Sequence, residues 1–241
     1  ERQILAALQH PNIAALLDGG VDASGRPWMV MEYVPGQQLD HWAKQATEAE
    51  KLAVLAQLCA ALSHAHGHLV IHRDIKPANV LVGSDGQAKL LDFGIAKLIS
   101  ALSVGDQTQA LATPNYAAPE QLLGEPVTVR TDVYGLGACL YALLTGQPPL
   151  QLDALSLPRL VDQVRHARPK PPSEVVSGIS ADLEAICLRC LEKEPAQRYS
   201  SVDELSQDLR RLEQGFPVLA RSPRRRDYLR SFIHRHRLAT I

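Results

Sequence analysis

The sequence predicts an α+β fold in which a helix and a few short strands come before a mostly helical body. Strand-forming runs are confined to residues 1–91, whereas apolar patterns with the period of a helix dominate the second half of the chain. The 241 residues suffice for one large domain or two small ones. The apolar fraction of 46% and the charged fraction of 21% are ordinary for a globular protein.

The first predicted elements are a helix and a strand. An apolar pattern of helical period over residues 4–8 ends at His10-Pro11, where proline stops a helix. The run 28–34 is rich in strand formers and stops at Pro35-Gly36. Gly19-Gly20 is expected to form a turn between strands.

A β-hairpin and several helices follow. Residues 80–82 and 88–91 flank a Ser-Asp-Gly turn, which predicts a hairpin. Amphipathic patterns predict helices over the remaining apolar stretches, and the last two open with a serine at the N-cap. These stretches are residues 48–66, 127–149, 180–193 and 200–213.

Cysteine usage and charge add two constraints. The four cysteines do not make a disulfide scaffold and point to a reducing compartment; Cys187-x-x-Cys190 has metal or redox spacing but lies on the apolar face of a predicted helix.

Residues 216–241 carry seven arginines and one acid, a net charge of about +6, whereas the preceding residues carry about −7. This asymmetry suggests an anionic membrane as partner or a solvated linker; nucleic acid is not expected because no recognition fold accompanies the arginines.

Residues 72–79 read His-Arg-Asp-Ile-Lys-Pro-Ala-Asn, and Asp92-Phe93-Gly94 follows. This pair of motifs resembles the catalytic loop and metal-binding turn of the protein kinases. Over nearly its whole length the chain is similar to Ser/Thr protein kinases of the bacterial receptor type, beginning inside the small lobe. The resemblance implies a two-lobed kinase fold with an incomplete small lobe in residues 1–34 and a helical large lobe in residues 35–215, followed by a basic linker in residues 216–241.

The resemblance assigns a role to each residue of the catalytic constellation. Asp74 would orient the substrate hydroxyl and accept its proton, and Lys76 would neutralise the transferred phosphoryl group. Lysine at that position also favours Ser/Thr over Tyr substrates. Asn79 and Asp92 would hold magnesium through oxygen atoms. Arg73 would pair with a phosphorylated residue of the activation segment.

Downstream landmarks agree with this resemblance. Glu120 of an Ala-Pro-Glu motif would form a buried ion pair with Arg198. Asp132 would bind the catalytic-loop backbone from a buried helix. Thr113 would hydrogen-bond the catalytic aspartate and lysine. Three further motif residues are expected to be structural: His72, Phe93 and Gly94.

The nucleotide side of the site is matched only in part. In the resemblance, Glu1 matches the helix glutamate that pairs with the ATP-binding lysine, and Met31 matches the gatekeeper. Glu32 and Val34 match the hinge residues whose backbone binds adenine, and Leu81 matches the residue beneath the base. No Gly-x-Gly-x-x-Gly occurs, and the first lysine is Lys44, beyond the hinge. The glycine-rich loop and the ATP-binding lysine are therefore expected upstream of residue 1, and the 241 residues alone are expected to be inactive.

The implied cofactors are ATP and Mg²⁺, with Mn²⁺ as a substitute, and the implied substrates are Ser or Thr residues of proteins. Self-association for autophosphorylation is expected, with Ser100, Ser103 and Thr108 as candidate sites. The tail suggests a membrane anchor just after residue 241, hence the cytoplasmic domain of a single-pass inner-membrane protein.

Two alternatives to a protein kinase remain open. One is a pseudokinase that acts as a scaffold, and the other is a small-molecule phosphotransferase of kinase-like fold. A metal site on the alternating His64, His66 and His68 is disfavoured, because residues two apart do not share a helix face.

Overall fold

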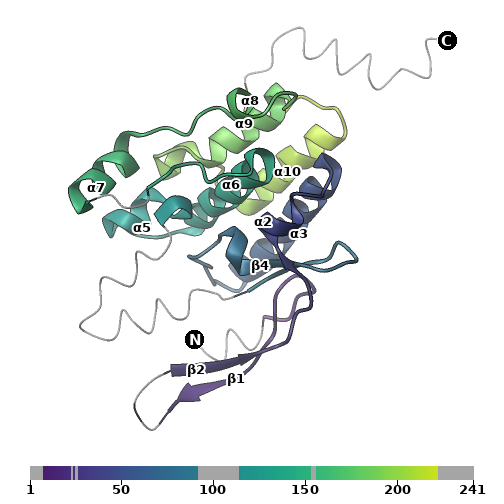
Figure 1. Cartoon of the computed structure of the whole chain (residues 1–241), viewed down its shortest axis with the longest axis vertical. Coiled ribbons are helices and arrows are strands. Elements are labelled where there is room, and N and C mark those ends of the chain that lie inside the picture. The colour runs from purple at the N-terminus through teal and green to yellow at the C-terminus, as the bar shows by residue number, and fades with distance from the viewer. Residues whose placement is uncertain (1–7, 23, 25–26, 92–113, 153–155, 222–241) are drawn as a thin grey trace, which may run out of the picture.

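The computed structural model describes residues 8–22, 24, 27–91, 114–152 and 156–221. Within these ranges a two-stranded ribbon projects from a helical body (Figure 1). Residues 4–7 of the helix expected over 4–8 fall outside the described ranges. So do eight of the sequence-predicted site residues: Glu1, Asp92, Phe93, Gly94, Ser100, Ser103, Thr108 and Thr113.

The projecting ribbon is an antiparallel pair of β1 (Leu16–Val21) and β2 (Pro27–Met31). The predicted turn at Gly19-Gly20 is wrong, because both glycines lie inside β1 and pair with β2. A Cβ on Gly20 would stand 2.7 Å from the indole of Trp28, so glycine makes room for that ring. The second strand also ends earlier than expected, at Met31.

The predicted hairpin is confirmed as part of a three-stranded sheet. The order is β3 (Gln37–Gln38), β4 (Val80–Val82) and β5 (Ala88–Leu90), all antiparallel. The small-lobe chain joins this sheet at Leu90, whose amide donates to the Asn12 carbonyl at 2.9 Å. This contact sets the base of the ribbon against the large lobe.

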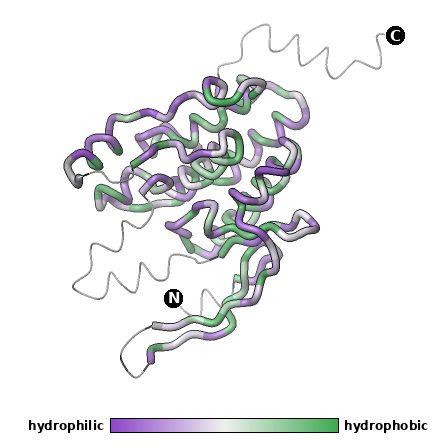
Figure 2. The backbone as a smooth tube through the Cα atoms, in the orientation of Figure 1, coloured by the Kyte–Doolittle hydropathy of each residue, from purple (hydrophilic) through white to green (hydrophobic). Residues whose placement is uncertain are grey.

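The body is built around four helices that the sequence predicts. They are α3 (Glu48–Gly67), α6 (Val129–Thr145), α9 (Ala181–Cys190) and α10 (Val202–Glu213). Helix α6 packs against the other three and is buried on almost every side, and after its first turn it carries apolar and small residues all round. Hydrophobic segments lie together inside the helical body (Figure 2). The expected serine caps form, since Ser180 and Ser201 accept from the amides of Leu183 and Glu204.

Further helices complete the large lobe. They are α2 (Leu39–Trp42), α5 (Pro119–Leu123), α7 (Leu157–His166) and α8 (Pro172–Val175). Helix α7 is as long as α9 and was not predicted from the sequence. All four cysteines are buried and free, and in the described part of the chain no group of three or more His, Cys, Asp or Glu could hold a metal ion. Within that same part, no helix combines the length and hydropathy needed to cross a bilayer.

Candidate active site

The catalytic loop gathers three predicted residues around one carboxylate. Lys76 Nζ lies 2.9 Å from Asp74 Oδ2, and Asn79 Nδ2 donates to the same oxygen at 2.9 Å and to the Asp74 carbonyl at 2.8 Å. Because its amide nitrogen is engaged, Asn79 keeps Oδ1 as a hydrogen-bond acceptor or metal ligand. Side chains of Asp74 and Lys76 are 21% and 19% exposed, so a substrate can reach them.

His72 connects the catalytic loop to the end of β5. It is fully buried; its Nδ1 accepts from the Asp74 amide at 3.2 Å and its Nε2 donates to the Leu91 carbonyl at 2.9 Å. The Leu91 amide in turn donates to the Asn79 carbonyl at 2.8 Å. These bonds fix the residue that directly precedes Asp92.

Asp132, on the buried helix α6, holds the backbone of the loop. Its carboxylate accepts from the amides of His72 at 2.8 Å and Arg73 at 2.9 Å, as the sequence predicts. It also accepts from His66 Nε2 at 2.8 Å, a contact that the sequence reasoning missed. The carboxylate is 1% exposed, so these three donors supply its solvation.

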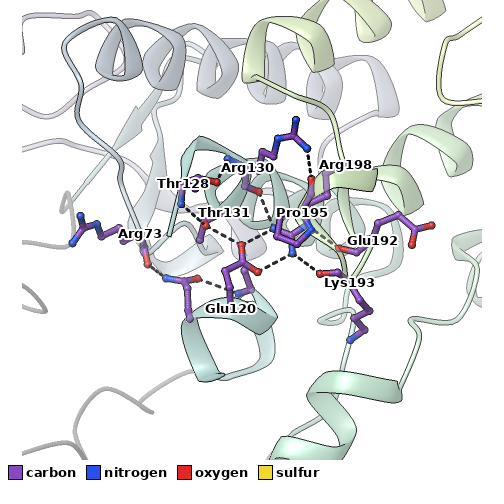
Figure 3. Close-up of polar contacts among 11 residues, drawn as sticks. Arg73, Glu120, Thr128, Arg130, Thr131, Glu192, Lys193, Pro195 and Arg198 are labelled. Atoms are coloured by element: carbon purple, nitrogen blue, oxygen red, sulfur yellow. Dashed lines mark hydrogen bonds and ion pairs between the residues drawn. The ribbon is translucent and has the colours of Figure 1, made fainter. Parts of the chain in front are cut away.

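Glu120 and Arg198 form the buried ion pair that the sequence predicts, and Figure 3 shows the contacts around it. The two guanidinium nitrogens lie 2.7 and 2.8 Å from the carboxylate oxygens, a bidentate geometry. Thr131 Oγ1 donates to Glu120 at 2.8 Å. Burial raises the pKa of Glu120, but the hydrogen bonds and charge of Arg198 outweigh it and hold the pKa below its usual value.

The guanidinium of Arg198 also donates to three backbone carbonyls. These belong to Glu192, Arg130 and Lys193, at 2.8, 3.0 and 3.0 Å. The pair therefore ties α5 to the start of α6 and to the turn before α10, three segments that are distant in sequence.

The positions that the resemblance assigns to nucleotide binding lie in residues 31–34 and on β4. Met31 ends β2, and the Glu32 amide donates to the Ala15 carbonyl at 2.9 Å. Glu32 also accepts from the Ala15 amide and forms an ion pair with Lys89; the hydrogen bond from Lys89 lowers its pKa most. Leu81 lies on the face of β4 opposite the buried Val80 and Val82, hence directed away from the large-lobe core.

The three alternating histidines go to different partners. His66 binds Asp132, His68 Nδ1 donates to the His64 carbonyl at 2.9 Å, and the His64 ring lies between those of His10 and His68 at centroid distances of 5.2 and 4.5 Å. His66 is therefore separate from the other two, as its spacing of two residues requires, whereas His64 and His68 are four residues apart and meet on one side.

Comparison with known families identifies the family to which the chain belongs. The protein kinase domain family matches residues 1–209. The chain belongs to the protein kinase family. The kinase fold accounts for the small sheets and the helical body, and the resemblance to bacterial Ser/Thr kinases is confirmed.

Curated bacterial kinases are similar over most of the chain. Serine/threonine-protein kinase PknB of Mycobacterium tuberculosis is 40% identical over 227 residues, which cover 90% of this chain and 36% of that protein. A probable serine/threonine-protein kinase of Streptomyces coelicolor is 37% identical, with 90% and 33% covered. Pkn1 of Myxococcus xanthus is 41% identical over 211 residues, with 84% and 30% covered. This kinase domain thus spans about a third of the length of these relatives.

Proposed function

We propose that this chain is the catalytic part of a protein kinase that transfers the γ-phosphate of ATP to Ser or Thr residues of proteins. One observation carries the proposal: Lys76 and Asn79 converge on the accessible carboxylate of Asp74. Phosphoryl transfer depends mainly on positioning and charge neutralisation, and this arrangement offers both.

In this proposal Asp74 accepts the proton of the substrate hydroxyl as the hydroxyl oxygen attacks phosphorus. A carboxylate suits this role because the hydroxyl has to be oriented more than it has to be deprotonated early. Lys76 lies beside Asp74 Oδ2 and places a cation where negative charge builds up on the transferred phosphoryl group. Arg73 and Thr113 are proposed to serve phosphate pairing and substrate positioning, respectively.

Magnesium is the cofactor that the donor set fits. Asn79 presents its side-chain oxygen because its nitrogen is bound to Asp74, and hard divalent cations prefer oxygen ligands. Asp92 is proposed as the second ligand. The bound cation would supply neutralisation of phosphate charge; Mn²⁺ would be accepted at the same oxygens.

We propose the nucleotide contacts at the hinge backbone of Glu32 and Val34, with Met31 as gatekeeper and Leu81 beneath the base. Residues 1–34 and 35–215 would form the two lobes around this cleft. The partner of Glu1 would be a lysine outside residues 1–241, since the first lysine here is Lys44. Residues 1–241 alone are accordingly expected not to transfer phosphate at a useful rate.

Two further parts of the proposal concern regulation and location. The kinase would phosphorylate its own activation segment at Ser100, Ser103 or Thr108 when two copies meet. The arginines of residues 216–241 would lie against the anionic cytoplasmic face of the inner membrane, next to a span beyond residue 241. An extended sequence with fewer than about 17 apolar residues in that place would contradict the anchor.

The test uses a polypeptide extended upstream by about 80 residues, the order of size of a missing lobe segment. We expect phosphate from labelled ATP on Ser or Thr of the chain itself and of added proteins, and its loss in Asp74→Asn and Asp92→Asn. A pseudokinase would bind partners without transfer in the parent as well. Activity of both variants at the parent level would show that the assigned roles are wrong.

A further inference from the structure

Arg73 adopts a backbone conformation that needs external support. Its φ is +68°, in the left-handed region that few residues other than glycine enter. Such a residue keeps this conformation only when its neighbours hold it. Asp132 holds the amide of Arg73 from one side. The carbonyl of the same residue is held by Gln121, whose Nε2 donates to it at 2.6 Å.

The direction of this carbonyl bears on the catalytic aspartate. The Arg73 carbonyl and the Asp74 amide belong to one planar peptide group. That amide donates to His72 Nδ1 at 3.2 Å. When Gln121 fixes the carbonyl, it fixes the plane from which the Asp74 side chain departs.

Gln121 is itself held in one orientation. Its Oε1 accepts from the Ala118 amide at 3.1 Å, and its Nε2 faces the Arg73 carbonyl. If the side-chain amide were flipped, its nitrogen would face the Ala118 amide and its oxygen would face the Arg73 carbonyl. Only the observed orientation therefore satisfies both contacts. Gln121 stands on α5 next to Glu120, which the buried pair with Arg198 immobilises.

We propose that Gln121 is a positioning residue that couples the end of the activation segment, which in sequence runs from Asp92 to the Ala-Pro-Glu motif at 118–120, to the catalytic loop; this rests on the proposed kinase function. Its one amide group binds Ala118, in the motif that closes the segment, and Arg73, which adjoins Asp74. The cavity beneath the loop, lined by Gln121, Asp74 and Asp132, has a volume of only about 10 Å³, which leaves room for one water at most. A displacement of the segment end therefore releases the Arg73 carbonyl and lets Asp74 turn away.

Two variants separate hydrogen bonding from packing. Gln121→Met keeps the length of the side chain and removes both hydrogen bonds. Gln121→Glu keeps the acceptor for Ala118 but faces the Arg73 carbonyl with an oxygen. Gln163→Met on α7 is the matched control, because Gln163 is an exposed helical glutamine away from the loop.

In the upstream-extended kinase we expect kcat to fall about tenfold or more in both Gln121 variants, with KM for ATP within about twofold of the parent. A merely structural role would lower the thermal midpoint and leave kcat per folded molecule unchanged, which would overturn the proposal. Gln163→Met should match the parent in both quantities.

A second readout does not depend on activity. Hydrogen–deuterium exchange should be faster at residues 72–76 in Gln121→Met than in the parent, with α9 unchanged in both. Equal exchange in the loop would overturn the proposal. If the extended parent transferred no phosphate, the proposed function would fail, and this exchange measurement would still decide whether Gln121 positions the loop.

Discussion

Replacing Arg198 by methionine should destabilise the fold by about 3–5 kcal/mol, because it breaks a buried ion pair from one side. Both partners are 2% exposed, and the contacts are bidentate at 2.7 and 2.8 Å. The variant leaves the Glu120 carboxylate in the interior, where Thr131 is its one remaining side-chain donor among the described residues. Three carbonyls also lose a hydrogen bond from Arg198, and these losses, about 1 kcal/mol each, are part of that total.

The partner variant should behave differently. Glu120→Gln keeps an oxygen for Thr131 and Arg198 and should cost less than Arg198→Met. Since the folded pKa of Glu120 lies below 4.5, its ionisation stabilises the fold above that pH, and this contribution is lost as pH falls through the folded pKa. Glu120→Gln should therefore show a weaker loss of stability under acid than the parent.

Urea unfolding followed by circular dichroism measures these differences. At 2–4 °C per kcal/mol, Arg198→Met should also lower the thermal midpoint by roughly 10 °C. Arg221→Met is the matched control, because its pair with Asp182 at 3.1 Å is 30% and 39% exposed and should contribute no more than about 1 kcal/mol. If Arg198→Met cost no more than Arg221→Met, the reasoning about the buried pair would be refuted.

Three further predictions concern stability and are measured by the same urea titration. Gly137→Ala should cost about 1–3 kcal/mol, because its Cβ would stand 2.3 Å from Cys190 Cβ, whereas Gly67→Ala meets open space and should be near neutral; equal effects would contradict this. Asp132→Ala should cost about 2–4 kcal/mol because two loop amides lose their acceptor, and an unchanged midpoint would refute that role. Burial and a neighbouring histidine lower the pKa of His10 below 6.5, so stability should decline as pH falls from 7.5 to 5, and His10→Phe should reduce this decline; an equal slope in both proteins would count against it.

The parts of the fold that the sequence predicts are those set by strong local patterns. The helix over 48–66 matches α3 because its capping box and apolar spacing are both local. The hairpin around 84–86 likewise follows from turn residues between strand formers. Gly19-Gly20 misled because glycine permits a turn, whereas here it accommodates the ring of Trp28 from the partner strand, which only the folded ribbon brings near.

The site residues likewise divide into those within one local motif and those that act through distant segments. Asp74, Lys76 and Asn79 were assigned from the resemblance of residues 72–79 to a kinase catalytic loop, and because they lie within one loop, local structure suffices to bring them together. His66 and Gln121 were missed, because their partners, Asp132 and Arg73, are distant in sequence and only the folded chain brings them near. For Gln121 a signal existed: a glutamine at the third position of a helix is typical of a capping box.

The central claim is that Asp74 serves the transfer of phosphate to a hydroxyl, and a single-turnover experiment tests it most directly. The upstream-extended kinase, saturated with Mg-ATP, is mixed with a Ser-containing protein substrate, and the rate of phosphate transfer is compared with that of Asp74→Asn. We expect the variant to bind ATP with the affinity of the parent and to transfer phosphate about a hundredfold more slowly or worse. Transfer at the parent rate by Asp74→Asn would contradict the account.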